Sequence, residues 1–326
     1  MSYLSTNNLS IGYNTKGRPT VILNNLNLNL HRGSLVALLG ANGAGKSTLL
    51  RTITAVQPPL EGTVEIAGVD IFKLTQRERS RLIGIVNTDR VMAGGLTVNE
   101  LVSLGRQPYT GFLGRLCNHD KEIVEQALHD AGIAHKADYY VSQLSDGERQ
   151  KAMIAKALAQ KTPIIILDEP TAFLDVASRF ETMRLLHDLA HNSGMTILLS
   201  SHDISQSLLL ADYVWAITSD KLMAEGNTED LILNGTIDRL FSSQALRFNR
   251  LTSDFETVLP HHATASVQCS DAQLRHCIAA ALMRNSFAIA DEAPTQIVAT
   301  NASHISLNGK VLHSVGELVS ELRKIK

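Results

Sequence analysis

Four mainly apolar runs of strand length lie between residues 35 and 199 of the chain. They are Leu35–Leu39, Ile83–Val86, Ile164–Leu167 and Met195–Leu199. Continuous runs of this kind are typical of central parallel strands that are covered on both faces. Helix-forming segments accompany them, at Val98–Gly105, Asp120–Gly132, Gly147–Gln160 and Arg179–His191. The pattern predicts an α/β core with a long, mostly helical insert at about residues 89–160.

The segment before this core alternates polar and apolar residues instead. Tyr3–Leu30 reads as strands joined by a polar loop, Asn14–Pro19, which is rich in turn-forming residues. Asn24–Leu30 has the period of a half-buried strand, and Gly62–Gly68 repeats that pattern and ends in a turn. We therefore expect an antiparallel β subdomain beside the parallel core.

The pattern changes again near residue 240, which predicts a domain of residues 1–240 and a small α+β C-terminal domain of residues 241–326. Leu251–Pro260 and Gln296–Lys310 read as strands, and Asp271–Asn285 and Ser314–Lys326 read as amphipathic helices. Asn308-Gly309 is a strong hairpin signal. Ser314-Val315-Gly316-Glu317 has the sequence of a capping box that opens the last helix.

The first apolar run leads directly into Gly40-Ala41-Asn42-Gly43-Ala44-Gly45-Lys46-Ser47. A strand before this segment and a helix after it are the context that the phosphate-loop pattern G-x-x-x-x-G-K-[ST] requires. Its glycines let successive backbone N–H groups point inward around an anion, and the helix start adds a positive dipole. The Lys46 ammonium can reach the β- and γ-phosphates, and the Ser47 hydroxyl can hold Mg²⁺. The segment predicts a nucleoside triphosphate site.

Acidic and histidine residues follow two of the other predicted strands. Asp168 and Glu169 come after Ile164–Leu167, and His202 follows Met195–Leu199 by two serines. Open α/β sheets bind ligands at the carboxyl ends of their strands. Asp168 can hold Mg²⁺ through water together with Ser47, and Glu169 can polarise the water that attacks the γ-phosphate. His202 can hydrogen-bond to that phosphate and sense its loss.

Composition narrows the classes of protein that remain. The 326 residues contain 30 Lys and Arg against 32 Asp and Glu, so net charge indicates no nucleic-acid partner. Three cysteines without framework spacing fit a reducing, cytosolic compartment. Met1–Gly12 lacks the pattern of a signal peptide, and no apolar run approaches the roughly 20 residues of a membrane span. We expect a protein without a membrane span of its own that is able to dock on a membrane partner.

Together with Leu144-Ser145-Asp146-Gly147-Glu148-Arg149-Gln150, these motifs resemble the ATP-binding subunits of ABC transporters. The heptapeptide resembles the signature motif of that family. Its residue types also have a physical explanation of their own. Ser145 begins a helix, Glu148 completes a capping box, and the helix start faces an anion. The motifs stand in family order from Gly40 to His202, and the resemblance covers Tyr3 to Leu240, about three-quarters of the chain.

The resemblance implies a P-loop ABC-type ATPase core with ATP and Mg²⁺ as cofactors. It makes Glu169, His202 and Lys46 the catalytic residues, and it makes Ser47 and Asp168 the Mg²⁺ ligands. The implied ATP-binding residues are Tyr13, Gly40, Asn42, Gly43, Gly45, Lys46, Ser47, Thr48, Thr88, Asp168, Glu169 and His202. Within this set, Tyr13 matches the aromatic residue that stacks on adenine.

The resemblance also implies partners. Two copies of such a domain close head-to-tail around ATP, so that the signature residues of one copy face the ATP bound by Lys46 of the other. Those residues are Ser145, Asp146, Gly147 and Glu148. Asp175 matches the loop that communicates between the two sites. The homodimer would drive transmembrane permease subunits, and indirectly serve a substrate-binding protein, from the cytoplasmic side of the inner membrane.

Two positions depart from the family pattern. Thr88 stands where the family has a glutamine that senses Mg²⁺ and contacts the membrane subunit. Asp146 replaces the first glycine of the signature, where a carboxylate would repel a γ-phosphate unless it faces away or caps the helix. We expect Asp146 to cap. Neither change touches Lys46, Asp168 or Glu169, so hydrolysis is expected.

Local resemblance narrows the transporter group. The stretch Leu96–Tyr109, with Gly111–Arg115, Asp120–Gly132 and Ala152–Leu174, is similar to importers of iron–siderophores, haem and vitamin B12. A metal-chelate importer is the leading hypothesis. The alternatives are a soluble ABC ATPase acting without a permease on nucleic acid, translation or cofactor assembly, and a hydrolysis-dead regulator. The second alternative is disfavoured because Glu169 and His202 are both present.

The C-terminal domain carries residues that invite a metal-sensor hypothesis. They are His261, His262, Cys269, His276 and Cys277. Their spacing matches no known finger, and the adjacent His276 and Cys277 would point about 100° apart on a helix. Ordinary packing and solvated side chains are therefore favoured over a bound metal, and a dimer-stabilising or regulatory module over a metal sensor.

Overall fold

The computed structural model describes residues 2–15, 18–87, 95–111, 114–241 and 243–325. The chain forms two compact units, one of residues 1–242 with 248–254 and one of residues 243–247 with 255–326. The main segment of the first unit ends two residues after the predicted domain boundary at residue 240. Residues 248–254, further along the chain, also belong to this unit. Thr88 lies outside the described residues.

An antiparallel sheet forms one part of the first unit. Its strands are β1 (Ser2–Thr15), β2 (Arg18–Leu26), β3 (Asn29–His31), β5 (Glu61–Ile66) and β6 (Val69–Asp70). Their order is β2-β1-β5-β6, and β3 also pairs with β1. The predicted antiparallel subdomain is confirmed. The predicted strand Asn24–Leu30 is wrong in one respect, because the chain leaves β2 after Leu26 and starts β3 at Asn29, although its leucines are buried as the alternation requires.

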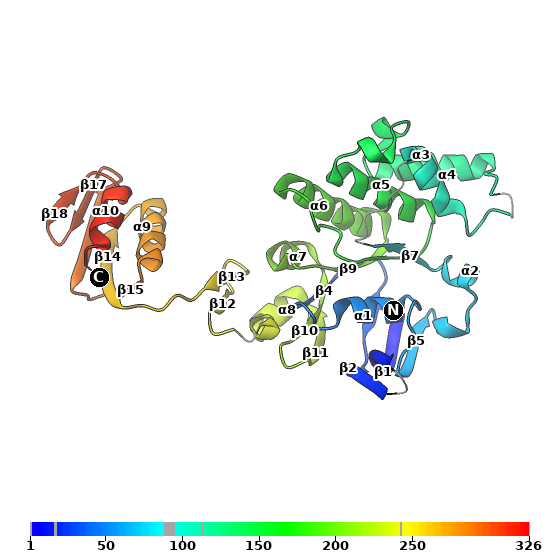
Figure 1. The fold of residues 1–326 in the computed structure, drawn as a ribbon, viewed down its shortest axis with the longest axis horizontal. Coiled ribbons are helices and arrows are strands. Elements are labelled where there is room, and N and C mark those ends of the chain that lie inside the picture. Colours follow the sequence, from blue (N-terminus) through cyan, green and yellow to red (C-terminus); the bar gives the residue numbers. More distant parts are fainter. Residues whose placement is uncertain (1, 16–17, 88–94, 112–113, 242, 326) are drawn as a thin grey trace. The chain divides into compact units, whose positions relative to one another are not determined.

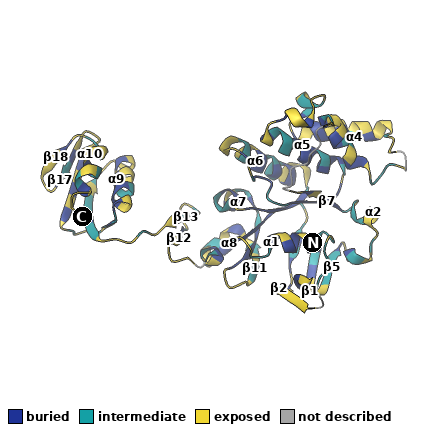
Figure 2. Ribbon diagram, viewed as in Figure 1, coloured by how far each residue is buried: buried dark blue, intermediate teal, exposed yellow. Residues whose placement is uncertain are grey.

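The second sheet has six strands in the order β11-β10-β4-β9-β8-β7. Its strands are β4 (Leu35–Gly40), β7 (Ile83–Val86), β8 (Ile164–Leu167), β9 (Thr196–Ser200), β10 (Tyr213–Ile217) and β11 (Met223–Asn227). All neighbours are parallel except β10 and β11. Every residue of β4, β8 and β9 is buried, which confirms the prediction from their apolar runs. Figure 2 shows this dark interior.

Helices cover both faces of this sheet, with α1 on one side and α6 and α7 on the other (Figure 1). The bounds are α1 (Lys46–Ile53), α2 (Gln76–Arg79), α6 (Val176–Ser193), α7 (Ile204–Leu210) and α8 (Thr228–Leu233), with 3₁₀ turns at Ile71–Lys73 and Ile237–Leu240. Strand β4 therefore leads through the glycine loop into α1. The strand, loop and helix predicted around Lys46 are confirmed.

The insert between β7 and β8 is helical where it is described. It contains α3 (Val98–Ser103), α4 (Asn118–Asp130) and α5 (Asp146–Ala159), with 3₁₀ turns at Leu104–Arg106, Ala134–Lys136 and Val141–Gln143. The buried Arg106 guanidinium joins these elements, since it pairs with Asp120 at 2.9 Å and donates to the carbonyl of Ala159 at 2.9 Å. The pair fixes α4 against the end of α5, the helix that the signature motif opens.

The second unit has its own core beneath a five-stranded sheet of order β15-β14-β16-β17-β18. Its elements are β14 (Ala263–Cys269), α9 (Ala272–Arg284), β15 (Phe287–Ile289), β16 (Thr295–Asn301), β17 (His304–Leu307), β18 (Lys310–Leu312) and α10 (Val315–Leu322). A separate two-stranded ribbon precedes it, made of β12 (Leu246–Asn249) and β13 (Asp254–Thr257). Both predicted helices and the hairpin at Asn308-Gly309 are confirmed.

Three details predicted for residues 241–326 are wrong. Strands β12, β14 and β15 were not predicted, only residues 254–257 of the predicted strand Leu251–Pro260 are extended, and the capping box of the last helix is incomplete. At α10, Ser314 accepts the N–H of Glu317 as the capping box requires. The Glu317 carboxylate, however, accepts the N–H of His313 rather than that of Ser314, so only half of the box forms.

Candidate functional site

The glycine loop holds the Lys46 side chain close to its own backbone. The Lys46 Nζ donates to the carbonyls of Gly40 at 2.7 Å and Ala41 at 3.2 Å, and the residue is only 6 % exposed. Burial lowers the pKa of the Lys46 ammonium, while the nearby Glu169 and Asp168 carboxylates act in the opposite direction. The two carboxylates that follow β8 therefore act electrostatically on the Lys46 ammonium. This is expected of side chains that follow the carboxyl ends of strands in one parallel sheet.

Glycine is required at the last loop position before the helix. Gly45 is the residue before α1 and has φ of 117°, in the left-handed range that favours glycine. A Cβ at this position would lie 2.7 Å from Cγ2 of Ile22 on β2. Gly43 also has a positive φ, but nothing lies within 4 Å of its Cβ position. The β2 strand thus packs against the start of the helix that presents Ser47 and Thr48.

Tyr13 stands beside this helix start. Its hydroxyl and the Thr48 hydroxyl lie 2.9 Å apart, and Tyr13 is 45 % exposed. An aromatic ring that is half exposed beside the phosphate loop can offer a face to a planar base. The side chain of Ser47 is exposed, as is that of Asn42.

The acidic pair and the histidine meet at the carboxyl ends of β8 and β9. The His202 Nε2 lies 2.5 Å from Glu169 Oε1. Glu169 adopts φ of 49°, a left-handed conformation that is uncommon for a residue with a side chain. Ser200 Oγ donates to Asp168 Oδ1 at 2.6 Å and accepts the N–H of Glu169 at 2.9 Å. Ser200 is not part of any of the sequence motifs, although it lies buried at the end of an apolar strand, two residues before His202.

The donor set suits a hard cation. A carboxylate at Asp168 and an exposed hydroxyl at Ser47 are oxygen ligands of the kind that Mg²⁺ takes beside phosphate groups. Those residue types fit the ion that the motifs imply.

The signature segment opens α5 with a complete capping box. Ser145 Oγ accepts the N–H of Glu148, and the Glu148 carboxylate accepts the N–H of Ser145. The hydrogen bond from the Ser145 N–H is the main cause that lowers the pKa of the Glu148 carboxyl. The expectation that Asp146 caps the helix is wrong, because Ser145 occupies that position. Asp146 instead pairs with Arg149 at 2.8 Å, and the guanidinium offsets its charge.

The start of α6 packs against the signature. Asp175 caps α6 through the N–H of Ser178, and this hydrogen bond lowers the pKa of its carboxyl. A Cβ on Gly147 would lie 2.6 Å from Oγ of Ser178. Gly147 therefore permits the close approach of the two helix starts. Lys151 and Glu181 tie the helices together one turn further on, at 2.6 Å.

The tail histidines and cysteines do not form a cluster of metal ligands. Among the residues that the structure describes, no group of three or more His, Cys, Asp or Glu side chains is arranged to hold a metal ion. The nearest feature is an edge contact between the rings of His304 and His313, 6.2 Å apart. Likewise, in the described part of the chain no helix is long and apolar enough to cross a membrane.

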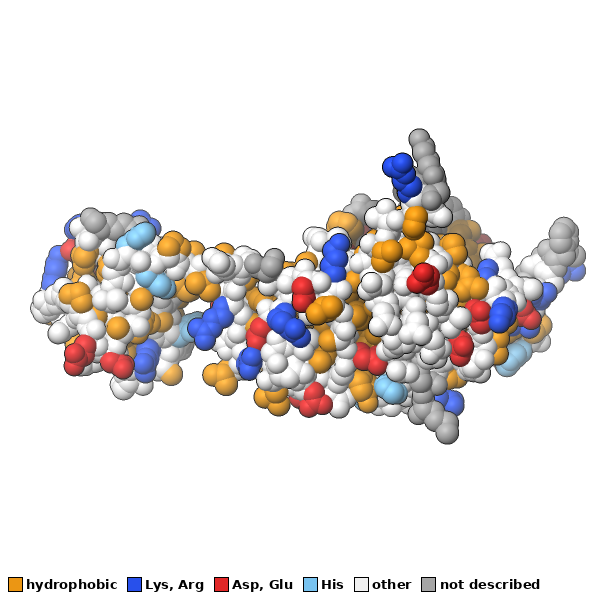
Figure 3. All heavy atoms as spheres, turned by 90° about the horizontal axis from the view of Figure 1, so that it is seen from below, with side chains coloured by type: hydrophobic (Ala, Val, Ile, Leu, Met, Phe, Trp, Pro, Cys, Tyr) orange, Lys and Arg blue, Asp and Glu red, His pale blue; other side chains and the backbone are white. Residues whose placement is uncertain are grey.

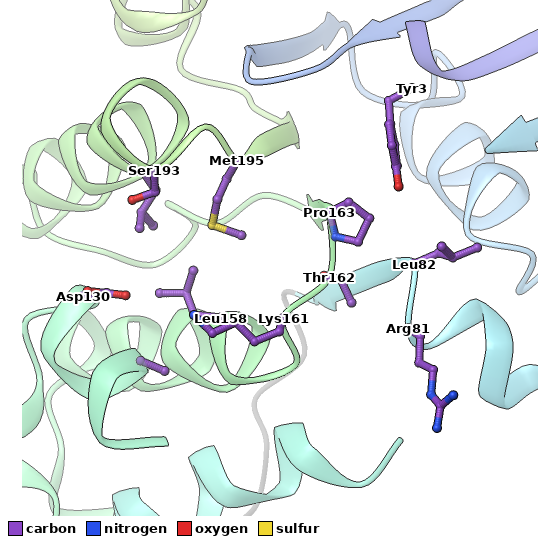
Figure 4. A pocket seen from close by; sticks show the side chains of 12 residues that line it. Tyr3, Arg81, Leu82, Asp130, Leu158, Lys161, Thr162, Pro163, Ser193 and Met195 are labelled. Carbon is purple, nitrogen blue, oxygen red and sulfur yellow. The ribbon is translucent and has the colours of Figure 1, made fainter. Parts of the chain in front are cut away.

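A cavity of about 530 Å³ lies elsewhere, at the amino ends of β7, β8 and β9 (Figure 4). Tyr3, Leu158, Lys161, Pro163 and Met195 are among the residues that line it. None of the described residues predicted for the nucleotide site does so. The cavity is thus at the opposite ends of the strands that present Asp168 and His202.

Comparison with known proteins decides the family. The family model of the ABC transporter matches residues 23–172. The protein named "Probable siderophore transport system ATP-binding protein YusV" of Bacillus subtilis (strain 168) is 38 % identical over 242 residues, covering 74 % of this chain and 86 % of that protein. This chain belongs to the ABC transporter ATP-binding proteins. It is therefore an ATPase subunit of a transport system, with the ABC cassette fold.

Two solved structures are similar to this chain over most of its length. The structure titled "An inward-facing conformation of a putative metal-chelate type ABC transporter" matches with a TM-score of 0.65 and 27 % identity, covering 79 % of this chain and 96 % of that chain. The dimeric ABC transporter cassette MJ0796 matches with a TM-score of 0.60 and 28 % identity, covering 69 % of this chain and 98 % of that chain. These matches support the ABC ATPase family. They assign no role to individual residues.

Proposed function

We propose that this chain is the ATP-hydrolysing subunit of an importer for metal chelates of the iron–siderophore, haem or cobalamin kind. The observation that best supports ATP hydrolysis is the contact between Glu169 and His202. The pair lies near Lys46 of the phosphate loop, where the Glu169 carboxylate opposes the effect of burial on the pKa of that lysine. The relative with the siderophore transport name and the metal-chelate transporter structure favour the cargo class.

The proposed chemistry uses the residues of the site in distinct roles. Lys46 binds the β- and γ-phosphates, and the loop N–H groups with the start of α1 complement their charge. Glu169 accepts a proton from the attacking water, and His202 orients the Glu169 carboxylate. Ser47 and Asp168 would hold Mg²⁺, which neutralises phosphate charge when bound. Tyr13 offers its ring to adenine.

One chain supplies half of each composite site in this proposal. Figure 1 shows α1 beside the antiparallel sheet and α5 among the helices of the insert, so that the two motifs begin on different elements of the unit. A second copy in head-to-tail arrangement would bring its Ser145 and Gly147 to the ATP held by Lys46. The dimeric cassette MJ0796 supports this arrangement by analogy. The pairing of Asp146 with Arg149 reduces the repulsion that its carboxylate would otherwise exert on ATP.

Permease docking is proposed at a second cavity of the first unit, of about 360 Å³. Its walls come from the end of α1, from α2, from β7 and from α5, and they include Val56, Ile85 and Lys156. Val56 is 68 % exposed and Ile85 is 39 % exposed. An exposed apolar lining of this kind suits the short helix of a partner lying in a groove. Docking there would hold the chain on the cytoplasmic side of the inner membrane.

The proposal is tested by purifying the tagged chain from detergent-solubilised membranes of its own cells. We expect a multi-span permease to co-purify, and Val56→Glu with Ile85→Glu to reduce its recovery at least about tenfold. Leu233→Glu, another exposed apolar residue outside the cavity, is the matched control and should have no effect. Recovery of soluble partners alone would favour an ABC ATPase that acts without a permease. Loss of radioactive iron–siderophore uptake on deletion tests the cargo class.

A further inference from the structure

Ser200 places one buried hydroxyl between the two acidic residues of the site. The residue is 0 % exposed and ends β9, next to the strand that leads to Asp168 and Glu169. Its Oγ donates to Asp168 Oδ1 at 2.6 Å and accepts the N–H of Glu169 at 2.9 Å. A single atom therefore contacts the side chain of one residue and the backbone of the next.

The hydrogen bond to Asp168 restricts how that carboxylate can turn. A hydroxyl-to-carboxylate bond of 2.6 Å lies in the short range of charge-assisted hydrogen bonds, which are stronger than neutral ones. The terminal torsion of an aspartate has broad minima, so its orientation depends on such contacts. Ser200 therefore restricts the rotation of the Asp168 carboxylate at the carboxyl end of β8.

The second hydrogen bond acts on the backbone of Glu169. This residue has φ of 49°, a conformation that costs free energy and persists where surrounding contacts over-determine it. The bond from its N–H to Ser200 is one such contact, and the pairing of its side chain with His202 is another. The carboxylate of Glu169 is thus held beside His202, two residues beyond the end of β9.

We propose that Ser200 is a positioning residue that sets the metal ligand Asp168 and the general base Glu169 in a fixed relation to each other. The inference rests on the proposed roles of these two residues and goes beyond them. Without the hydroxyl, Asp168 loses one orienting contact and the Glu169 N–H loses its acceptor. The metal affinity and the turnover number then fall, while binding of the nucleotide without metal is retained.

The variants separate positioning from packing. Ser200→Ala removes the hydroxyl with little change in volume, and Ser200→Thr keeps it. Ser34→Ala is the matched control, because Ser34 is also buried and bonds through Oγ to the carbonyl of His31, away from the acidic pair. Thermal unfolding of all three checks that each variant folds.

The decisive readout is metal binding without turnover. Mn²⁺ is titrated into the full chain with ADP present and followed by electron paramagnetic resonance, and ADP binding is measured separately in EDTA. We expect Ser200→Ala to weaken Mn²⁺ binding about tenfold, a typical loss for a charge-assisted hydrogen bond, with ADP affinity in EDTA unchanged. The turnover number should fall while KM for ATP at saturating Mg²⁺ stays near wild type. Ser200→Thr should restore both.

Asp168→Asn distinguishes the two levels of the proposal. If Asp168→Asn leaves Mn²⁺ affinity unchanged, the assignment of Asp168 as a metal ligand is wrong and the inference about Ser200 falls with it. If Asp168→Asn weakens Mn²⁺ binding and Ser200→Ala does not, only the inference about Ser200 is overturned. A Ser200→Ala effect matched by Ser34→Ala, or one on unfolding temperature alone, would equally contradict positioning.

Discussion

At the scale of residues, the site brings one buried cation and two acidic side chains together from separate strands. Lys46 is the first residue of α1, after β4 and the glycine loop, and Asp168 and Glu169 follow the end of β8, with β9 between these strands. The acidic side chains oppose the effect of burial on the pKa of Lys46. The motifs predicted this meeting because parallel strands end at one edge of a sheet. They could not predict the bridge made by Ser200, since serine after a strand is ordinary in any sequence.

Glu169→Gln is expected to leave ATP binding intact and to reduce turnover at least about a thousandfold, because the amide cannot accept the proton of the attacking water. ATP binding is measured by equilibrium titration and turnover by phosphate release. The variant should also accumulate as a dimer with ATP in size-exclusion chromatography, because hydrolysis no longer separates the copies.

Glu229→Gln is the matched control for Glu169→Gln, since Glu229 is an exposed carboxylate in the first turn of α8. It should keep wild-type turnover. If Glu169→Gln also keeps it, the assignment of Glu169 as the general base is wrong.

At the scale of elements, prediction succeeded where the apolar pattern is strong and failed where it is weak. The all-apolar runs of β4 and β8 and the paired turn residues Asn308-Gly309 predict their elements directly. Leu251 contributes to the predicted strand Leu251–Pro260, yet it is 98 % exposed and lies in the turn before β13. Strand β14 has the sequence Ala263–Cys269, whose small and polar residues give little contrast between its two faces. One face of β14 is buried because the strand packs against α9, a tertiary contact that the sequence pattern does not reveal.

The end of α6 provides an element-scale prediction about pH. The His191 Nε2 lies 3.0 Å from Asp212 Oδ1, and Asp212 Oδ2 accepts the N–H of Leu35 at the start of β4. The carbonyl of His187, followed by Asp212, raises the pKa of His191 above its usual 6.5. Since the folded pKa is the higher one, this stabilisation is complete below the unfolded pKa and is lost as pH rises through the folded pKa.

His191→Gln should therefore lower the unfolding temperature more at pH 5.5 than at pH 8.5. The side chain of His191 is 40 % exposed, so solvent screening limits the effect to below about 1 kcal/mol. Calorimetry at both pH values measures the difference, and Asn192→Gln, at the next position and also exposed, is the non-titrating control. A pH-independent loss would contradict the proposed ion pair of His191 with Asp212.

At the scale of the whole molecule, two units with separate cores share one chain. Buried residues of the antiparallel and parallel sheets form one hydrophobic cluster, and the C-terminal sheet with α9 and α10 forms another. The nucleotide-site residues belong to the first unit. On the face in Figure 3, positive and negative side chains are interspersed, in keeping with the net charge of −2. Sequence periodicity located both cores but carried no information on what the second unit binds.

Separate cores predict two unfolding transitions with different ligand responses. A ligand stabilises the unit that binds it by RT ln(1 + [L]/Kd), about 2.7 kcal/mol at a hundredfold excess over Kd. In Glu169→Gln, which should hold ATP without consuming it, ATP with Mg²⁺ should raise the transition of the first unit by several degrees and leave the other in place. Ile278 lies on the buried face of α9, and Ile278→Ala should lower the unfolding free energy of the second unit by about 2–4 kcal/mol. The transition that moves to lower temperature in this variant is therefore that of the second unit. If Ile278→Ala lowers both transitions together, or if ATP shifts both, the units unfold as one cooperative body and the second unit senses the nucleotide through the first.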